Sequence, residues 1–218
     1  MKKKWLIILS LAFVVILLLA FVATIPTLSD NSYSYFVTSS GQAVITGFDK
    51  TYWGNLSITR QLDGFPVTVI DRNAFSGCTR LTSVTIPNSV TRIGDCAFGD
   101  CTRLTSVAIP NSVTNIGRWV FSGCTSLTRI TVDTANPKYS SLDGVLFNKE
   151  QTSLIKYPYG RSGTYMIPDS VINIGDGAFG GCTRLTSVAI PSSVTNIDGQ
   201  VFSGCTSLTR ITVDTANP

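Results

Sequence analysis

The chain has 218 residues, of which 44% are hydrophobic and only 14% are charged, and its formal net charge is +4. Because globular domains carry about 25% charged residues, Ser, Thr and Asn must supply most of the polar surface. Three of the 17 basic residues are Lys2, Lys3 and Lys4 at the N-terminus, and the remaining 14 are nearly balanced by 13 acidic residues. This near-neutral charge excludes the basic surface of a nucleic-acid-binding protein. The chain has no histidine, the commonest general base and metal ligand, so composition argues against an enzyme or a metalloprotein.

The N-terminal segment, residues 1–25, has the pattern of a membrane anchor. Residues 5–25 follow the three lysines without a charge, and their length matches the roughly 20 residues that cross a bilayer. A cleaved signal peptide has a shorter apolar region and small residues before the cut, whereas cleavage after Ala23 would place Phe21 at the third position. We expect an uncleaved anchor with the lysines in the cytoplasm and the rest of the chain outside. Cleavage, which would give a secreted protein, is the alternative.

Residues 26–66 are predicted to form an N-terminal β cap. They contain short stretches of alternating polar and apolar residues and the turn-like pair Asp63-Gly64. An open repeat array needs such a polar end to remain soluble.

An internal repeat dominates residues 67–218. The segment from Cys78 to Pro87 recurs at 101–110 and 182–191, and a variant at 124–132 recurs at 205–213. The first cysteines of successive copies, 78, 101 and 124 and then 182 and 205, are 23 residues apart. A larger unit is also duplicated, since residues 101–137 match 182–218 at 33 of 37 positions. The four differences are Asn111/Ser192, Gly117/Asp198, Arg118/Gly199 and Trp119/Gln200.

The first complete repeat predicts one coil of a solenoid. Val84 and Ile86 alternate with polar residues as in a strand with one buried face, and Pro87 ends that strand. A second short apolar segment follows, and Phe98 is large enough to fill the interior of the coil. Because a single coil cannot bury its own apolar side, we expect the coils to stack with parallel strands and with equivalent residues in ladders.

The repeats resemble the BspA-like subclass of leucine-rich repeats. The pattern C-x-x-L-T-x-V-x-I-P-x-S-V-x-x-I-G-x-x-A-F-x-G is met fully or nearly so at Leu81–Phe98, Leu104–Phe121 and Leu185–Phe202. The resemblance implies a right-handed leucine-rich-repeat superhelix, mainly parallel β with short helical or 3-10 turns. It also implies a cell-surface or secreted protein, because members of the family are associated with adhesion and with binding of extracellular matrix proteins.

Residues 138–166 depart from the repeat. They are predicted to form a hairpin insertion with a polar turn at residues 148–151, whose second strand joins the sheet of the solenoid. Repeats are expected on both sides, in residues 67–137 and 167–218. The last repeat stops at Pro218, where the first duplicated unit continues, so we expect an uncapped end of a truncated product or of a longer array. An uncapped strand edge could pair with a second chain.

Residues that point outward from the strands are the candidate protein-binding residues. They form a flat concave face of small polar groups on which Arg129 and Arg210 would be anchors, since arginine is enriched at binding hot spots. The alternative is an ordinary solvated sheet face. In a loop that looks exposed, Tyr157 and Tyr159 are further candidates for contact with a partner or a glycan, with packing of the hairpin as the alternative. The outward strand residues are Ser83, Thr85, Ser106, Ala108, Arg129, Thr131, Ser187, Ala189, Arg210 and Thr212.

Five cysteines occupy one repeat position and are predicted to be small buried residues in a structural ladder. Stacked strands place ladder residues about 4.8 Å apart, which is close enough for a disulfide, but their side chains point the same way. Cys96 lies at a variable position and is either a free thiol or a partner for Cys101. The five ladder residues are Cys78, Cys101, Cys124, Cys182 and Cys205.

The sequence therefore predicts a surface protein that binds a protein ligand, plausibly a matrix glycoprotein or another cell surface. It contains no Gly-x-Ser-x-Gly nucleophile motif and no phosphate-binding Gly-x-x-x-x-Gly-Lys loop, and we expect no enzymatic activity, cofactor or metal. The alternatives are a structural protein that associates with itself through the uncapped end and a fragment without activity of its own.

Overall fold

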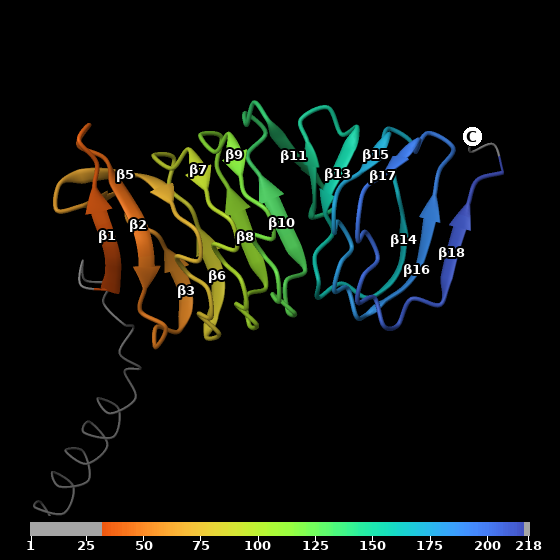
Figure 1. Ribbon diagram of the computed structural model, residues 1–218, viewed down its shortest axis with the longest axis horizontal. Helices are drawn as coiled ribbons and strands as arrows, with labels where there is room; N and C mark the ends of the chain where they lie inside the picture. The colour runs from red at the N-terminus through yellow and green to blue at the C-terminus, as the bar shows by residue number, and fades with distance from the viewer. Residues whose placement is uncertain (1–31, 216–218) are drawn as a thin grey trace, which may run out of the picture.

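A computed structural model describes residues 32–215 of the chain. The predicted anchor in residues 5–25 lies outside this range, as do the last three residues. Among the described residues, no helix is long and apolar enough to cross a membrane. The described part is a parallel β-solenoid of about seven turns, each of which contributes one strand to a broad face that we call the strand face (Figure 1).

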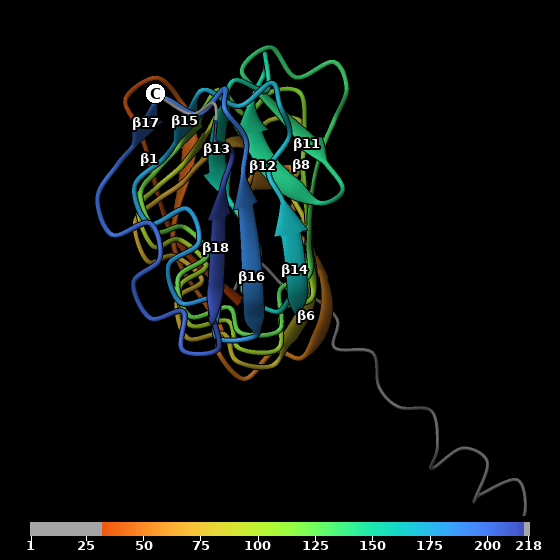
Figure 2. The same cartoon turned by 90° about the vertical axis from the view of Figure 1, so that its right-hand side faces the viewer.

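The strand face consists of two separate parallel sheets. In the first block of coils the strands are β3 (Gly54–Ser57), β6 (Leu81–Thr85), β8 (Ser106–Ile109) and β10 (Arg129–Val132). In the second block they are β14 (Gly163–Met166), β16 (Leu185–Ile190) and β18 (Arg210–Val213), which lie side by side in Figure 2. No strand joins β10 to β14 in the described chain, so the strand face is interrupted between the blocks.

The remaining strands form two further sheets on the opposite side of the coils. The first block uses β1 (Tyr33–Val37), β2 (Ala43–Phe48), β5 (Phe65–Ile70), β7 (Arg92–Ile93) and β9 (Asn115–Ile116), with β4 (Gln61–Leu62) beside β5. The second block uses β11 (Tyr139–Leu142), β12 (Val145–Asn148), β13 (Ser153–Lys156), β15 (Asn173–Ile174) and β17 (Asn196–Ile197).

The predicted cap in residues 26–66 is only partly a separate element. The antiparallel pair β1–β2 lies at the end of the solenoid, but β3 already pairs in parallel with β6 as the first strand of the strand face. Asp63-Gly64 forms the expected turn, and Asp63 has a positive φ of 49° as the tight β4–β5 connection requires.

Short helical or 3-10 turns were expected on the outer side of each coil, and the described residues contain almost no helix and no α-helix. The outer segments are single turns closed by bonds between residues three apart, such as Gly99 N–H to the Cys96 carbonyl at 2.8 Å. A helix cannot continue there because Cys96 has a φ of 52°, and its equivalents Asn73, Trp119 and Gln200 are also left-handed.

Stacked aromatic rings fill the interior of the coils. Phe75 lies 5.0 Å from Phe98 between ring centroids, and Phe98 lies 6.0 Å from Phe121. In the second block, Phe179 stacks on Phe202 at 5.3 Å in the same manner. Each ring pair stabilises the fold by about 1 kcal/mol beyond the burial of the rings. The stacked coils are therefore held in the register that aligns the rings.

The insertion contains two turns where one was predicted. Strands β11, β12 and β13 form an antiparallel meander, with the expected turn at residues 148–152 and an additional turn at Asp143-Gly144. Beyond the meander, β13 pairs in parallel with β15 and β14 with β16, so residues 153–166 already belong to the second block. The hairpin insertion proper is therefore β11–β12 and shorter than the predicted range of 138–166.

Strand β12 separates two hydrophobic cores. Leu146 packs into the core of the first block, whereas Val145 and Phe147 pack into the core of the second, and all three are buried. Successive side chains of a strand point to opposite faces, so one strand can serve both cores.

The insertion also covers the strand edges at the end of the first block. On β10, the Ile130 N–H donates to the Gly144 carbonyl at 2.9 Å and the Val132 N–H donates to Ser141 Oγ at 3.0 Å. On β9, the Ile116 N–H donates to the Tyr139 hydroxyl at 3.1 Å. Edge groups that would otherwise be open to another chain are thereby paired within the molecule.

Asn136 holds the insertion onto the preceding coil. It is fully buried, its amide nitrogen donates to the carbonyls of Pro110 and Val113 at 2.7 and 2.9 Å, and its carbonyl oxygen accepts from the N–H groups of Lys138 and Tyr139. One side chain thus satisfies four backbone groups where the chain leaves the repeat.

Replacement of Asn136 by Ala should destabilise the fold by about 3 kcal/mol, because it leaves several buried backbone groups without a partner. Urea unfolding followed by circular dichroism would measure the loss. The control is Asn111→Ser, an exposed change to the residue that the duplicated unit carries at Ser192, which should cost less than about 0.5 kcal/mol. Equal effects of the two substitutions would contradict the role given to Asn136.

Candidate functional site

The strand face of the first block presents two rows of outward side chains. The parallel register aligns Ser83 with Ser106 and Arg129 in one row. It aligns Thr85 with Ala108 and Thr131 in the other. Arg129, Thr85 and Thr131 are exposed, while the two serines are half-buried. The result is a flat surface of small side chains with a single cation at its edge.

The strand face of the second block is similar but smaller. Ser187 aligns with Arg210, and Ala189 aligns with Met166 and Thr212. The side chain of Met166 is 75% exposed, although the sequence pattern did not single it out. An exposed methionine provides an adaptable apolar contact beside the polar row.

Arg129 and Arg210 were expected as two anchors of one continuous face, and the structure places them on different sheets. The tip of the insertion lies between the blocks, and a β-carbon on Gly144 would approach the Arg129 Cγ to 3.1 Å. The stem of Arg129 is therefore packed against the tip of the hairpin. Within the described residues, Arg210 on β18 has no such neighbour.

Each block also has a shallow hollow at the carboxyl ends of its strands. The hollow of the first block, about 340 Å³, is lined by Thr131, Val132 and Asp133, and that of the second, about 300 Å³, by the equivalent residues 212–214. The duplication therefore repeats a surface feature as well as a coil.

Tyr157 and Tyr159 were candidates for contact with a partner or a glycan. Burial contradicts that assignment for Tyr157, whereas Tyr159 lines a cleft beside the insertion. Tyr157 is 1% exposed and takes the interior position of the phenylalanines, with its ring 5.1 Å from that of Phe179. Tyr159 is 9% exposed, and burial raises the pKa of its hydroxyl to about 12. The loop is short because it replaces a full outer turn, and the ring of Tyr157 turns inward to fill the coil.

Lys156 lies against the ring of Tyr159. Its ammonium donates to the carbonyls of Gly177 and Gly180 at 3.0 and 3.2 Å and lies 4.0 Å from the centre of the Tyr159 ring. Burial lowers the pKa of Lys156 to about 8, because removal of water disfavours the charged form.

The five ladder cysteines lie at the inner end of the outer turns. The thiol of Cys101 donates to the Phe75 carbonyl at 3.2 Å, and the thiol of Cys124 donates to the Phe98 carbonyl at 3.0 Å. All six cysteines are free thiols in the structure, and Cys96 is half-buried on an outer turn. Burial raises the pKa of Cys78 and of Cys182 to about 12. In the described chain, no group of three or more acidic or cysteine residues could hold a metal ion.

Comparison with known proteins places the chain in a family. The family model described as a BspA type leucine rich repeat region matches residues 68–160 and 163–217 in 6 copies, and the chain belongs to this family. The protein is therefore a leucine-rich-repeat protein, and proteins of this class generally mediate protein–protein interaction.

Among solved structures, the chain is similar to the leucine-rich repeat protein of T. pallidum, with 28% identity and a TM-score of 0.58 over 85% of this chain and 81% of that one. It shares its fold with the pneumococcal vaccine antigen PcpA, at 18% identity and a TM-score of 0.50 over 84% of this chain and 68% of the antigen. A search among curated proteins finds no match.

The thiols provide a test of the ladder. In the native protein at pH 8, Cys96 should react first with a chromogenic disulfide reagent, because the thiolate is the reactive form and the thiols of Cys78 and Cys182 stay protonated and covered. After unfolding without reductant, all six thiols should react. The variant Cys96→Ser should lose the fast phase. Fewer than six thiols after unfolding would contradict the ladder of free thiols.

Proposed function

We propose that the protein is a binding scaffold of the cell surface and not an enzyme. Residues 5–25 would anchor it in the membrane with the solenoid outside, and cleavage of that segment would release it as a secreted protein. Its partner would be a protein on the extracellular side, either a matrix glycoprotein or a protein of another cell surface, and binding would mediate adhesion. Membership of the leucine-rich-repeat family supports a role in protein–protein interaction.

The observation that carries the proposal is the strand face of the first block. Four parallel strands present a flat surface on which small polar residues surround the exposed guanidinium of Arg129. A flat surface of small side chains loses little side-chain entropy when a partner covers it. Arginine offers five donors in a rigid fork, which suits a carboxylate or backbone carbonyls of a protein ligand.

The insertion makes Arg129 a better anchor than Arg210. Both residues occupy the same position of the duplicated unit, but only the stem of Arg129 packs against the hairpin tip at Gly144 within the described chain. A restricted stem loses less conformational freedom on binding, so the same side chain contributes more to affinity.

This difference predicts the outcome of a binding titration of the full chain, in detergent, against immobilised fibronectin as a matrix glycoprotein. Arg129→Glu should weaken binding by about tenfold or more, and Arg210→Glu should have a smaller effect. The matched control is Arg92→Glu, a charge reversal at an exposed position of β7 on the opposite side of the coils, which should leave the affinity unchanged.

Equal effects of the Arg129 and Arg92 substitutions on the affinity would contradict the assignment of the binding site to the strand face of the first block. Absence of saturable binding by the wild-type chain, with a native circular dichroism spectrum, would contradict a matrix glycoprotein as the partner.

Self-association is a second proposal, favoured by the apolar residues of the last coil. Ile211 on β18 is 45% exposed, whereas its equivalent in the first block, Ile130, is fully buried beneath the insertion. Strand β18 pairs with β16 on one side only among the described residues. Pairing with a second copy would cover this edge.

Sedimentation velocity at increasing concentration would detect this association as a rise in mean mass. Ile211→Lys should abolish the rise, because a charge at a covered edge opposes pairing, while the exposed substitution Thr85→Lys on the other sheet should preserve it. A wild-type chain that stays monomeric at the highest concentration would contradict self-association.

A further inference from the structure

The coil that follows the insertion is shortened on its outer side. In an ordinary coil of the second block, four residues separate Ile174 on the short strand from Phe179 in the interior. In the coil before it, Leu154 pairs with Ile174 and Tyr157 stacks on Phe179, yet only two residues lie between Leu154 and Tyr157. This coil therefore lacks an outer turn, whereas the coils on both sides of it have one.

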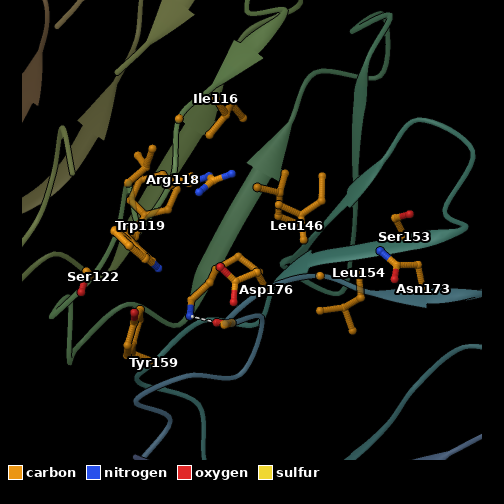
Figure 3. Close-up of a pocket in the computed structure, with 17 residues that line it drawn as sticks. Ile116, Arg118, Trp119, Ser122, Leu146, Ser153, Leu154, Tyr159, Asn173 and Asp176 are labelled. Atoms are coloured by element: carbon orange, nitrogen blue, oxygen red, sulfur yellow. Dashed lines mark hydrogen bonds between the residues drawn. The ribbon is translucent and has the colours of Figure 1, made fainter. Parts of the chain in front are cut away.

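The omitted turn leaves a cleft of about 290 Å³, which we call the insertion cleft (Figure 3). One wall is the outer turn of the coil before the insertion, residues 116–122, and the other is the turn at residues 173–177. This volume lies at the lower end of the range for small-ligand sites, which is about 300–1,000 Å³.

Five side chains give the insertion cleft its chemistry: Arg118, Trp119, Lys156, Asn173 and Asp176. Figure 3 shows the indole nitrogen of Trp119 directed toward Asp176 and the guanidinium of Arg118 directed toward Leu146. Asn173 lies at the far end of the cleft, and the ammonium of Lys156 closes the base. Within residues 32–215, neither the Arg118 guanidinium nor the Asp176 carboxylate has a hydrogen-bond or ion-pair partner, so both can bind a ligand.

The duplication indicates that this surface is specialised. The two units differ at only four of 37 positions, and three of the four, Gly117, Arg118 and Trp119, line the insertion cleft. In the second unit, Asp198, Gly199 and Gln200 take these places on a coil that does not adjoin the insertion. The sequences of the two duplicated units thus differ mainly at the positions that line the cleft in the first unit.

Trp119 is not explained by packing. Its indole is 56% exposed, and its backbone φ of 53° is one that bulky residues rarely adopt. Gln200 has a φ of 52° at the equivalent position, so the coil forms equally well without the ring. The exposed ring at the rim of the cleft is therefore available to a ligand.

We propose that the insertion cleft binds a neutral sugar, one or two rings of a glycan. The indole of Trp119 offers a flat apolar surface to the C–H face of a sugar ring, and a sugar hydroxyl both donates and accepts hydrogen bonds. Arg118 only donates and Asp176 only accepts. The Oδ1 of Asn173 already accepts from Asn196 Nδ2, so Asn173 offers its amide N–H groups, and adjacent hydroxyls satisfy all three side chains. An anion would meet Asp176 and a cation would meet Arg118, while the Lys156 ammonium is already held by the carbonyls of Gly177 and Gly180. The two unpaired charges of the cleft therefore balance, which favours a neutral ligand.

This site is independent of the strand face, and the test uses free sugars. Saturation-transfer NMR on the full chain in detergent would compare a panel of neutral disaccharides of glucose, galactose, mannose and their N-acetylated forms with uronic acids and with free amino acids. We expect the neutral sugars to bind with dissociation constants of about 1 mM. Trp119→Gln, which installs the residue of the second unit, and Asp176→Asn should each weaken binding by about tenfold.

Trp53→Gln is the matched control, because Trp53 is also an exposed indole but lies just before β3, away from the insertion cleft. It should leave sugar binding unchanged. Binding of only acidic sugars or amino acids, absence of binding to the whole panel by a natively folded chain, or an affinity unaltered by Trp119→Gln would each overturn the proposal.

Discussion

The pairing of each coil with the next is the constraint on which the rest of the structure depends. No coil can bury its own apolar side, so the aromatic ladder and the backbone bonds between coils must both be in register. The Gly94 N–H donates to the Ile70 carbonyl at 2.7 Å, and 23 residues later the Gly117 N–H donates to Ile93 at 2.8 Å. Gly94 must be a glycine here, because a β-carbon would lie 2.6 Å from the Arg72 backbone nitrogen.

Departures from this periodicity create the features that can bind. The hairpin of β11 and β12 covers the edges of the first block, and its strand β12 divides the two cores. The same element interrupts the strand face, restrains Arg129 and is followed by the shortened coil that opens the insertion cleft. Repetition therefore provides a rigid framework, while the single irregular region distinguishes one copy of the duplicated unit from the other.

Periodicity made most of the fold predictable from the sequence. The alternation of Val84 and Ile86, the stop at Pro87 and the interior place of Phe98 follow from residue types that have one physical role in a stacked coil. Leucine-rich-repeat membership follows from the same pattern. The Asp143-Gly144 turn was missed although Asp-Gly is a strong hairpin signal, because the apolar residues around it were assigned to one continuous strand.

The binding surfaces were less predictable, since they depend on how coils of different length meet. Tyr157 and Tyr159 looked exposed because Pro and Gly surround them, yet Tyr157 fills the interior of the shortened coil and Tyr159 lines the cleft. The insertion separates Arg129 from Arg210, and the shortened coil that follows it opens the cleft beside Trp119. Local sequence carries no signal for either, although the clustering of differences between the duplicated units points to residues 117–119.

Residue-resolved amide hydrogen exchange tests the stacked-coil account most directly. The account predicts slow exchange at donors that link neighbouring coils, namely Gly94, Gly117 and, in the second block, Gly175. It predicts faster exchange at Thr79, whose N–H donates only within its own exposed turn. Exchange at Gly94 and Gly117 as fast as at Thr79, in a natively folded chain, would contradict the register between coils on which the account depends.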